Sequence, residues 1–172
     1  MFLLPFDFWG DWLALRNFTK VEDGGKMGKF TTFWREMMRV AFISCAKDKQ
    51  KGRHKAKDIY ISNLFKLSLE YASRDFDKVF ILSAKFGVLE LETYIRDYEL
   101  NLNKLPVGQR KKWAEKVAMQ IRQSVPHDAE LHFFCGRGYR KFVIEILGEG
   151  RCFSPLARLG FGQQLRWYKS RL

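Results

Sequence analysis

The segment Arg39-Val-Ala-Phe-Ile-Ser44 is a short apolar run with a polar residue at each end, which is the pattern of a buried β-strand. Two further runs have the same character, Lys78-Val-Phe-Ile-Leu-Ser83 and Glu130-Leu-His-Phe-Phe-Cys135. Strands that are apolar throughout, without alternation, are typical of parallel sheets covered on both faces. The three runs therefore predict the centre of a buried, mostly parallel sheet.

Helical patterns separate these strands. Asp58 can N-cap a helix that runs to about Arg74, and Pro106 suits the first turn of another helix. We expect segments 45–57 and 84–105 to be loops or irregular chain. The remaining expected elements follow the third strand: a helix over 139–147, a short strand near Cys152 and a final helix from about Gly162. This alternation predicts an α/β fold, a mostly parallel sheet with helices on both faces in a single domain.

We predict that this domain spans residues 37–172 and that residues 1–36 are an N-terminal extension of uncertain role. The extension is rich in aromatic residues and has no clean period. It lacks the basic region and the small-residue cleavage site of a signal peptide. No run reaches the roughly 18 apolar residues of a transmembrane helix, so we expect no membrane contact. A chain that starts at Met38 is expected to keep the fold.

The chain is strongly basic, with 31 Lys and Arg against 19 Asp and Glu, a net charge of +12 and a pI near 9.8. Three basic blocks, 40–57, 104–122 and 137–172, carry net charges of +5, +5 and +6 and flank the mildly acidic stretch 58–103. A pI above about 9 is typical of nucleic-acid-binding domains. We therefore expect a polyanionic partner, although a merely solvated basic surface is the alternative.

The cysteines and histidines do not form a recognisable metal site. Three widely spaced cysteines fit neither a disulfide framework nor a CxxC site, so we expect reduced thiols and a cytoplasmic location. The three histidines do not form a ligand pair, and His132 is expected to be a core residue of its strand. The sequence thus predicts neither a metal nor another cofactor.

Ligands of open α/β sheets bind at the carboxyl ends of the strands. Here the three strands end at Ser44-Cys45-Ala46-Lys47, at Ser83-Ala84-Lys85 and at Cys135-Gly136-Arg137-Gly138-Tyr139-Arg140. Each end carries small residues followed by a cation, which suits close approach to a phosphate. We expect phosphate or nucleic acid to bind there, and loops that happen to be basic are the alternative.

The candidate catalytic groups lie near the same strand ends. The residues with carboxylate, amide or amine groups that suit general acid–base or covalent chemistry are Asp58, Asp97, Glu99, Asn103 and Lys85. Each has a simpler interpretation: helix capping for Asp58, a polar loop for the next three, and phosphate binding or an ion pair for Lys85. Cys45 is a further possible nucleophile, or a buried structural thiol. The pair Gln163-Gln164 opens the last helix and suits a base edge, a phosphate or simple capping.

Six motifs stand out along the chain: Ser44-Cys45-x-Lys47-x-Lys49, Asp58-x-Tyr60, Ile81-Leu-Ser-Ala-Lys-Phe-Gly-Val-Leu89, Tyr98-x-x-x-Leu102, Gly136-x-x-Tyr139-Arg140 and Gly160-x-Gly162-Gln-Gln-Leu165. Together they resemble the bacterial and phage domains related to the YaaA peroxide-stress protein. The resemblance covers about residues 38–167, and its third and sixth motifs are the most specific.

The resemblance implies an α/β domain associated with DNA or with modified nucleosides. Its neighbourhood includes antiphage DNA glycosylases that remove hypermodified bases such as glucosylated hydroxymethylcytosine. A glycosylase needs double-stranded DNA with a flipped base and a group that positions water against the sugar. The residues expected to bind substrate or DNA are Ser44, Cys45, Lys47, Lys49, Tyr60, Ser83, Tyr98, Arg137, Tyr139, Arg140, Gln163 and Gln164.

Three functions are therefore open. The first is a DNA glycosylase that cleaves the N-glycosidic bond of a modified base. The second is a non-enzymatic DNA-binding protein of the stress response, and the third is an enzyme of free nucleosides such as a deoxyribosyltransferase. Abasic sites in treated DNA would be produced only by the first.

Overall fold

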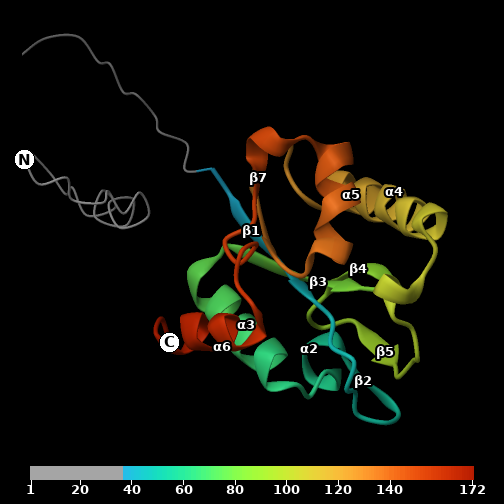
Figure 1. The fold of residues 1–172 in the computed structure, drawn as a ribbon, viewed down its shortest axis with the longest axis vertical. Coiled ribbons are helices and arrows are strands. Elements are labelled where there is room, and N and C mark those ends of the chain that lie inside the picture. The colour runs from blue at the N-terminus through green and yellow to red at the C-terminus, as the bar shows by residue number, and fades with distance from the viewer. Residues whose placement is uncertain (1–36) are drawn as a thin grey trace, which may run out of the picture. The chain divides into compact units, whose positions relative to one another are not determined.

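The computed structural model describes residues 37–172, so the predictions about residues 1–36 lie outside the described residues (Figure 1). A five-stranded sheet in the order β4-β3-β1-β6-β7 forms its centre. Its strands are β1 (Arg39–Ser44), β3 (Lys78–Ser83), β4 (Gly87–Glu90), β6 (Glu130–Phe134) and β7 (Cys152–Phe153). β1 pairs in parallel with β3 and β6, β6 pairs in parallel with β7, and only the edge strand β4 is antiparallel within the described sheet.

Five helices cover the two faces of this sheet. Figure 1 shows α4 (Val107–Ser124) and α5 (Arg137–Leu147) together on one face. α2 (Ala56–Ile59), α3 (Asn63–Asp75) and α6 (Phe161–Lys169) lie on the other. The apolar side chains of β1 divide accordingly, since Val40 and Phe42 pack with α4 while Ala41 and Ile43 pack with α2 and α3. The predicted α/β fold with helices on both faces is confirmed.

The three predicted strands are in place because each is apolar on both faces and both faces are covered. Phe42 stacks between Phe80 and Phe133, with ring centroids 5.6 and 5.1 Å away, which joins the three central strands on the α4 face. The predicted inward positions of α4 are also confirmed, because Trp113, Val117 and Ile121 are buried.

The first helix differs from the prediction. It was expected to start at an Asp58 cap, but Asp58 lies inside the one-turn helix α2 and is exposed. The longer helix α3 begins after Ser62, whose hydroxyl accepts a hydrogen bond from the Phe65 backbone N–H at 3.3 Å. The chain between the two helices is extended at Tyr60, which turns this aromatic ring into the core.

The segments expected to be irregular contain regular structure. β4 forms a hairpin with β3, and β2 (Arg53–Lys55) pairs antiparallel with β5 (Tyr94–Arg96) in a separate two-stranded ribbon. Two 3₁₀ turns, η2 (Leu102–Lys104) and η3 (Glu149–Arg151), precede α4 and β7. The ribbon strands have three residues each, which is too short for alternation to be read.

Within residues 37–172, no helix is long and apolar enough to cross a membrane.

Candidate functional site

The carboxyl ends of β1 and β3 lie side by side. Ser44 is in register with Leu82, and the Cys45 backbone N–H donates to the Leu82 carbonyl at 3.0 Å. The next residues of the two strands, Cys45 and Ser83, therefore come together at one edge of the sheet. This is the edge at which the sequence placed a ligand site.

Three hydroxyl groups form a buried chain at this edge. The Tyr98 hydroxyl lies 2.7 Å from Ser83 Oγ and 3.1 Å from the Tyr60 hydroxyl. Ser83 is fully buried, and Tyr60 and Tyr98 are 1% and 8% exposed. The Ser83 hydroxyl also accepts the backbone N–H groups of Lys85 and Phe86, at 3.3 and 3.2 Å. These bonds fix the turn that follows β3.

A thiol and a third phenol extend this group. Cys45 Sγ lies 3.2 Å from the hydroxyl of Tyr139, a residue in the first turn of α5. The Tyr139 ring packs edge-on against Trp113, whose indole N–H donates to the Ser83 carbonyl at 3.0 Å. We call the five residues Cys45, Tyr60, Ser83, Tyr98 and Tyr139 the strand-end cluster.

Burial is the main cause of the raised pKa values of the three cluster phenols. It raises the pKa of Tyr60 to about 12, and the nearby Cys45 thiol adds to the effect. The pKa values of Tyr98 and Tyr139 are also raised, first by burial and next by Cys45. All three phenols are therefore neutral near pH 7 and can both donate and accept hydrogen bonds.

Two lysines converge on the cluster from different loops. The Lys49 Nζ lies 4.4 Å from the centre of the Tyr98 ring and 5.7 Å from that of Tyr60. The Lys85 Nζ lies 5.8 Å from the Tyr98 ring centre. Neither ammonium group forms an ion pair with a carboxylate of residues 37–172. Their positive charge is thus available to an anionic ligand.

The predicted catalytic carboxylates form no hydrogen bond or ion pair with the side chains of the strand-end cluster, although Asp97 and Glu99 flank Tyr98 in the chain. Asp58 and Glu99 are exposed. Asp97 accepts the Gly52 N–H at 3.0 Å, which holds the pKa of its carboxyl below the usual range, and Lys51 lies 3.5 Å away. Asp97 therefore stabilises the end of the β2–β5 ribbon by holding the segment that precedes β2.

Asn103 and Lys85 are the two predicted catalytic residues that lie beside the cluster. The Asn103 side chain touches the first turn of α5 so closely that a Cβ atom on Gly138 would come within 1.8 Å of its Oδ1. A glycine at position 138 therefore leaves room for the Asn103 side chain. Because Gly138 directly precedes Tyr139, this contact brings Asn103 next to the strand-end cluster. No local sequence pattern predicts this contact, because Asn103 and Gly138 are far apart in the chain.

The other predicted binding residues divide into two groups. Ser44, Lys47, Arg137 and Arg140 stand at the strand ends or at the start of α5, as expected. Gln163 and Gln164 instead cap α6, since Gln163 Oε1 accepts the Gly160 N–H at 2.9 Å and Gln164 Nε2 donates to the Leu159 carbonyl at 2.8 Å. The simpler interpretation of this glutamine pair agrees with the structure.

Trp113 makes a contact near the strand-end cluster that the sequence did not predict. The sequence predicted it as a core residue of α4, but its indole also binds the end of β3. A buried tryptophan needs an acceptor for its N–H, which is the signal that could have indicated such a contact.

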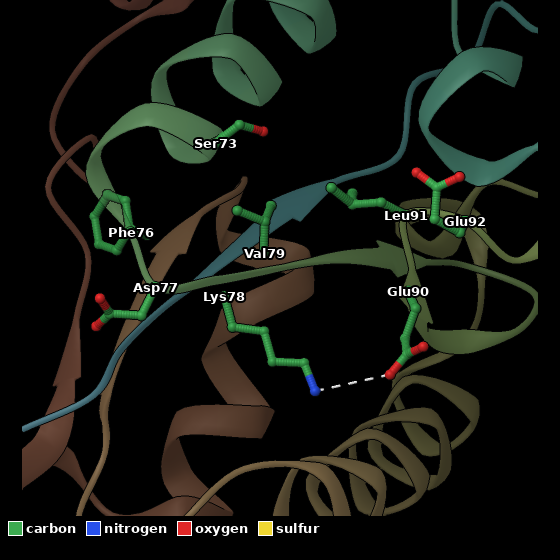
Figure 2. Close-up of a pocket in the computed structure, with 8 residues that line it drawn as sticks. All are labelled: Ser73, Phe76, Asp77, Lys78, Val79, Glu90, Leu91 and Glu92. Carbon is green, nitrogen blue, oxygen red and sulfur yellow. Dashed lines mark ion pairs between the residues drawn. The ribbon is translucent and has the colours of Figure 1, made fainter.

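A shallow pocket of about 370 Å³ lies at the opposite end of β3 (Figure 2). Its lining includes Phe76, Val79 and Leu91 and the ion pair between Lys78 and Glu90, with Nζ and Oε1 3.7 Å apart. In Figure 2 the side chains of Lys78 and Glu90 point toward each other and away from Ser73 of α3. The pocket contains none of the predicted site residues.

The fold and the strand-end cluster define an α/β protein with a phenol-rich, positively charged site at the carboxyl edge of a mostly parallel sheet. Residues 40–170 match a model described as a family of unknown function, DUF6884, and the chain belongs to that family. Neither the curated proteins nor the solved structures contain a match to the chain.

Proposed function

We propose that this protein acts on DNA, holding a nucleotide at the strand-end cluster and cleaving the N-glycosidic bond of a modified base. One observation carries the proposal: the Lys49 and Lys85 ammonium groups approach the same buried ring, that of Tyr98, whose hydroxyl is bound to Ser83. The two cations suit phosphate, and the phenols offer hydrogen bonds to a base or sugar.

The composition of the site supports the same proposal. All five cluster residues belong to the motifs by which the sequence resembles the YaaA-related domains. The net charge of +12 favours a polyanion over a small neutral substrate. The three free cysteines fit the cytoplasmic location that we propose.

Hydrolysis of the bond adds the hydroxide part of water to C1′ of the sugar, and the base leaves with the bonding electrons and takes up a proton. Among the predicted catalytic residues, Asn103 and Lys85 lie beside the cluster and are the groups we propose to position water or to neutralise phosphate. If the Lys85 amine instead attacked C1′, the base would leave with the bonding electrons and the sugar ring would open to a Schiff base between C1′ and Nζ. Borohydride would reduce this Schiff base to a stable secondary amine.

A second candidate is DNA binding without catalysis. It is favoured by Asp58, Asp97 and Glu99, whose carboxylates form no hydrogen bond or ion pair with the side chains of the strand-end cluster. An oxocarbenium-like sugar is usually stabilised by a nearby anion. The two candidates share the same binding site and differ in whether the DNA is altered.

The first experiment measures binding. Fluorescence anisotropy with a labelled duplex is recorded over a series of salt concentrations for the parent, for Lys49→Ala/Lys85→Ala and for Lys116→Ala/Lys169→Ala. The control removes the same charge from exposed positions on α4 and α6. The plot of log K against log salt should be about 2 units shallower for the first variant only. Equal slopes for all three proteins would contradict binding at the cluster.

The second experiment measures base release. Duplexes with normal, hydroxymethylated or glucosylated cytosine are incubated with the protein and then treated with alkali, which breaks the strand at abasic sites. Breaks with one of these duplexes, and their loss by about a hundredfold in Asn103→Ala, are expected for a glycosylase. Tight binding with intact strands would leave the non-enzymatic candidate.

A further inference from the structure

The β2–β5 ribbon places two like charges directly opposite each other. Arg53 is in register with Arg96, and like charges at opposed positions destabilise a strand pair. Both side chains are exposed and neither pairs with a carboxylate of residues 37–172. An arrangement that costs stability in the free protein indicates a role in binding.

The outer face of this ribbon carries mostly exposed side chains. Residues alternate across a strand, so Arg53, Lys55, Tyr94 and Arg96 share one face. Ile95 on the other face is 5% exposed and anchors the ribbon to the core. Tyr94 is 55% exposed, and the Arg53 guanidinium lies 5.4 Å from the centre of its ring.

The acidic residues near the ribbon pair with its lysines and not with Arg53 or Arg96. Glu92 pairs with both Lys55, at 2.7 Å, and Lys57. Asp97 pairs with Lys51 and accepts the Gly52 N–H. These contacts hold both ends of the ribbon in place. Arg53 and Arg96, the pair at the end of the ribbon next to Asp97, are therefore available to a ligand.

The ribbon is continuous with the strand-end cluster. β5 ends at Arg96, and Tyr98 of the cluster follows two residues later. On the other strand, Lys49 precedes β2 and forms a backbone bridge with Tyr60. A chain bound at the cluster would therefore have the ribbon as its neighbour, and Figure 1 shows β2 and β5 beside α2 at this end of the molecule.

We propose that the outer face of the β2–β5 ribbon binds the phosphate backbone of duplex DNA next to the nucleotide held at the strand-end cluster. Arg53 and Arg96 contact phosphates, and the exposed Tyr94 ring packs on the adjoining sugar or base. The inference rests on the proposed function, because the cluster supplies the reason for DNA to lie there. Two-stranded ribbons and arginine pairs are both established means of contacting a duplex.

The test compares charge-matched variants of the full chain. Arg53→Gln/Arg96→Gln should weaken duplex binding and make the salt slope about 2 units shallower, since two phosphate contacts are lost. Arg158→Gln/Arg166→Gln removes the same charge from exposed positions outside the ribbon and should keep the slope of the parent. The ribbon variant should unfold at the same or a higher urea concentration, because a repulsive pair has been removed.

The remaining outcomes separate the two proposals. A ribbon variant that binds with the slope of the parent overturns this inference, and the proposed function stands if Lys49→Ala/Lys85→Ala is still impaired. Parent slopes in both variants overturn both proposals. An equal loss in the Arg158→Gln/Arg166→Gln control also overturns the inference, because the effect would then follow net charge alone. Loss of binding in Tyr94→Ala with an unchanged slope would support the packing role of the ring.

Discussion

The Tyr98 hydroxyl connects the strand-end cluster to the central sheet. It contacts Ser83 at the end of β3 and Tyr60 after α2, so one side chain ties both segments to the edge of the sheet. The sequence predicted all three residues as binding residues because they lie in motifs. Their mutual hydrogen bonds could not be predicted, since Tyr60 and Tyr98 are 38 positions apart.

Burial of Tyr60 predicts how stability depends on alkaline pH. Its pKa is raised to about 12 in the folded chain, against about 10 when unfolded. Between these values the folded state keeps a proton that the unfolded state has lost, so stability is full below pH 10 and falls as pH rises toward 12. The loss from this group is about 2 to 3 kcal/mol. Urea unfolding at pH 9, 10, 11 and 12 would measure it.

The variant Tyr60→Phe is the control for this effect. It should be less stable than the parent at pH 9, because the Tyr98 hydroxyl loses a partner, but its stability should fall less steeply above pH 10. Absorbance of tyrosinate would follow the ionisation directly. An equal slope in both proteins would mean that Tyr60 is not responsible for the pH dependence.

At the scale of elements, the start of α3 shows a limit of sequence reasoning. Asp58 and Ser62 are both good N-cap residues, four positions apart, and both precede apolar residues. Propensity alone could not choose between them. Burial of Tyr60 in an extended conformation decides the matter, because it ends α2 and forces the helix to restart.

This difference predicts a matched pair of stability effects. Ser62→Ala removes the hydroxyl that accepts the Phe65 N–H and should lower the free energy of unfolding by about 1 kcal/mol. Asp58→Ala changes an exposed side chain and should stay within about 0.5 kcal/mol of the parent. Urea titration of both variants checks the assignment, which the reverse order of effects would contradict.

The turn between β3 and β4 depends on a glycine. Gly87 has φ of +83°, and a Cβ atom there would lie 2.1 Å from Gln120 Oε1, which accepts the Val88 N–H at 2.9 Å. Gly87→Ala should therefore cost about 1–2 kcal/mol from backbone strain, with a further loss as Gln120 is displaced. Gly108→Ala, in the first turn of α4 where no atom lies within 4 Å of the new Cβ, should be neutral or slightly stabilising. Thermal melting would compare the two.

At the scale of the whole molecule, the sheet was predictable and the ribbon was not. Long apolar runs such as Arg39–Ser44 identify buried strands on their own. β2 and β5 have three residues each and their paired residues are 39 to 43 positions apart, so their pairing depends on contacts that no local pattern encodes. The carboxyl-edge rule predicts a ligand site at the edge where the strand-end cluster lies. The long-range hydrogen bonds that form this cluster could not be predicted from the sequence.

The whole-molecule prediction concerns the boundary of the domain. A chain that starts at Met37 should unfold in a single cooperative transition, because β1 and both core clusters of the described residues lie within 38–172. Starting at Met37 keeps the charged amino terminus off Met38, whose carbonyl accepts the Glu130 N–H at 2.9 Å and extends the β1–β6 pairing. Circular dichroism with thermal melting, compared with the full chain, is the measurement. A broad transition, or a midpoint more than about 10 °C lower, would show that residues 1–36 contribute about 3 kcal/mol or more to stability, and that the domain begins before residue 37.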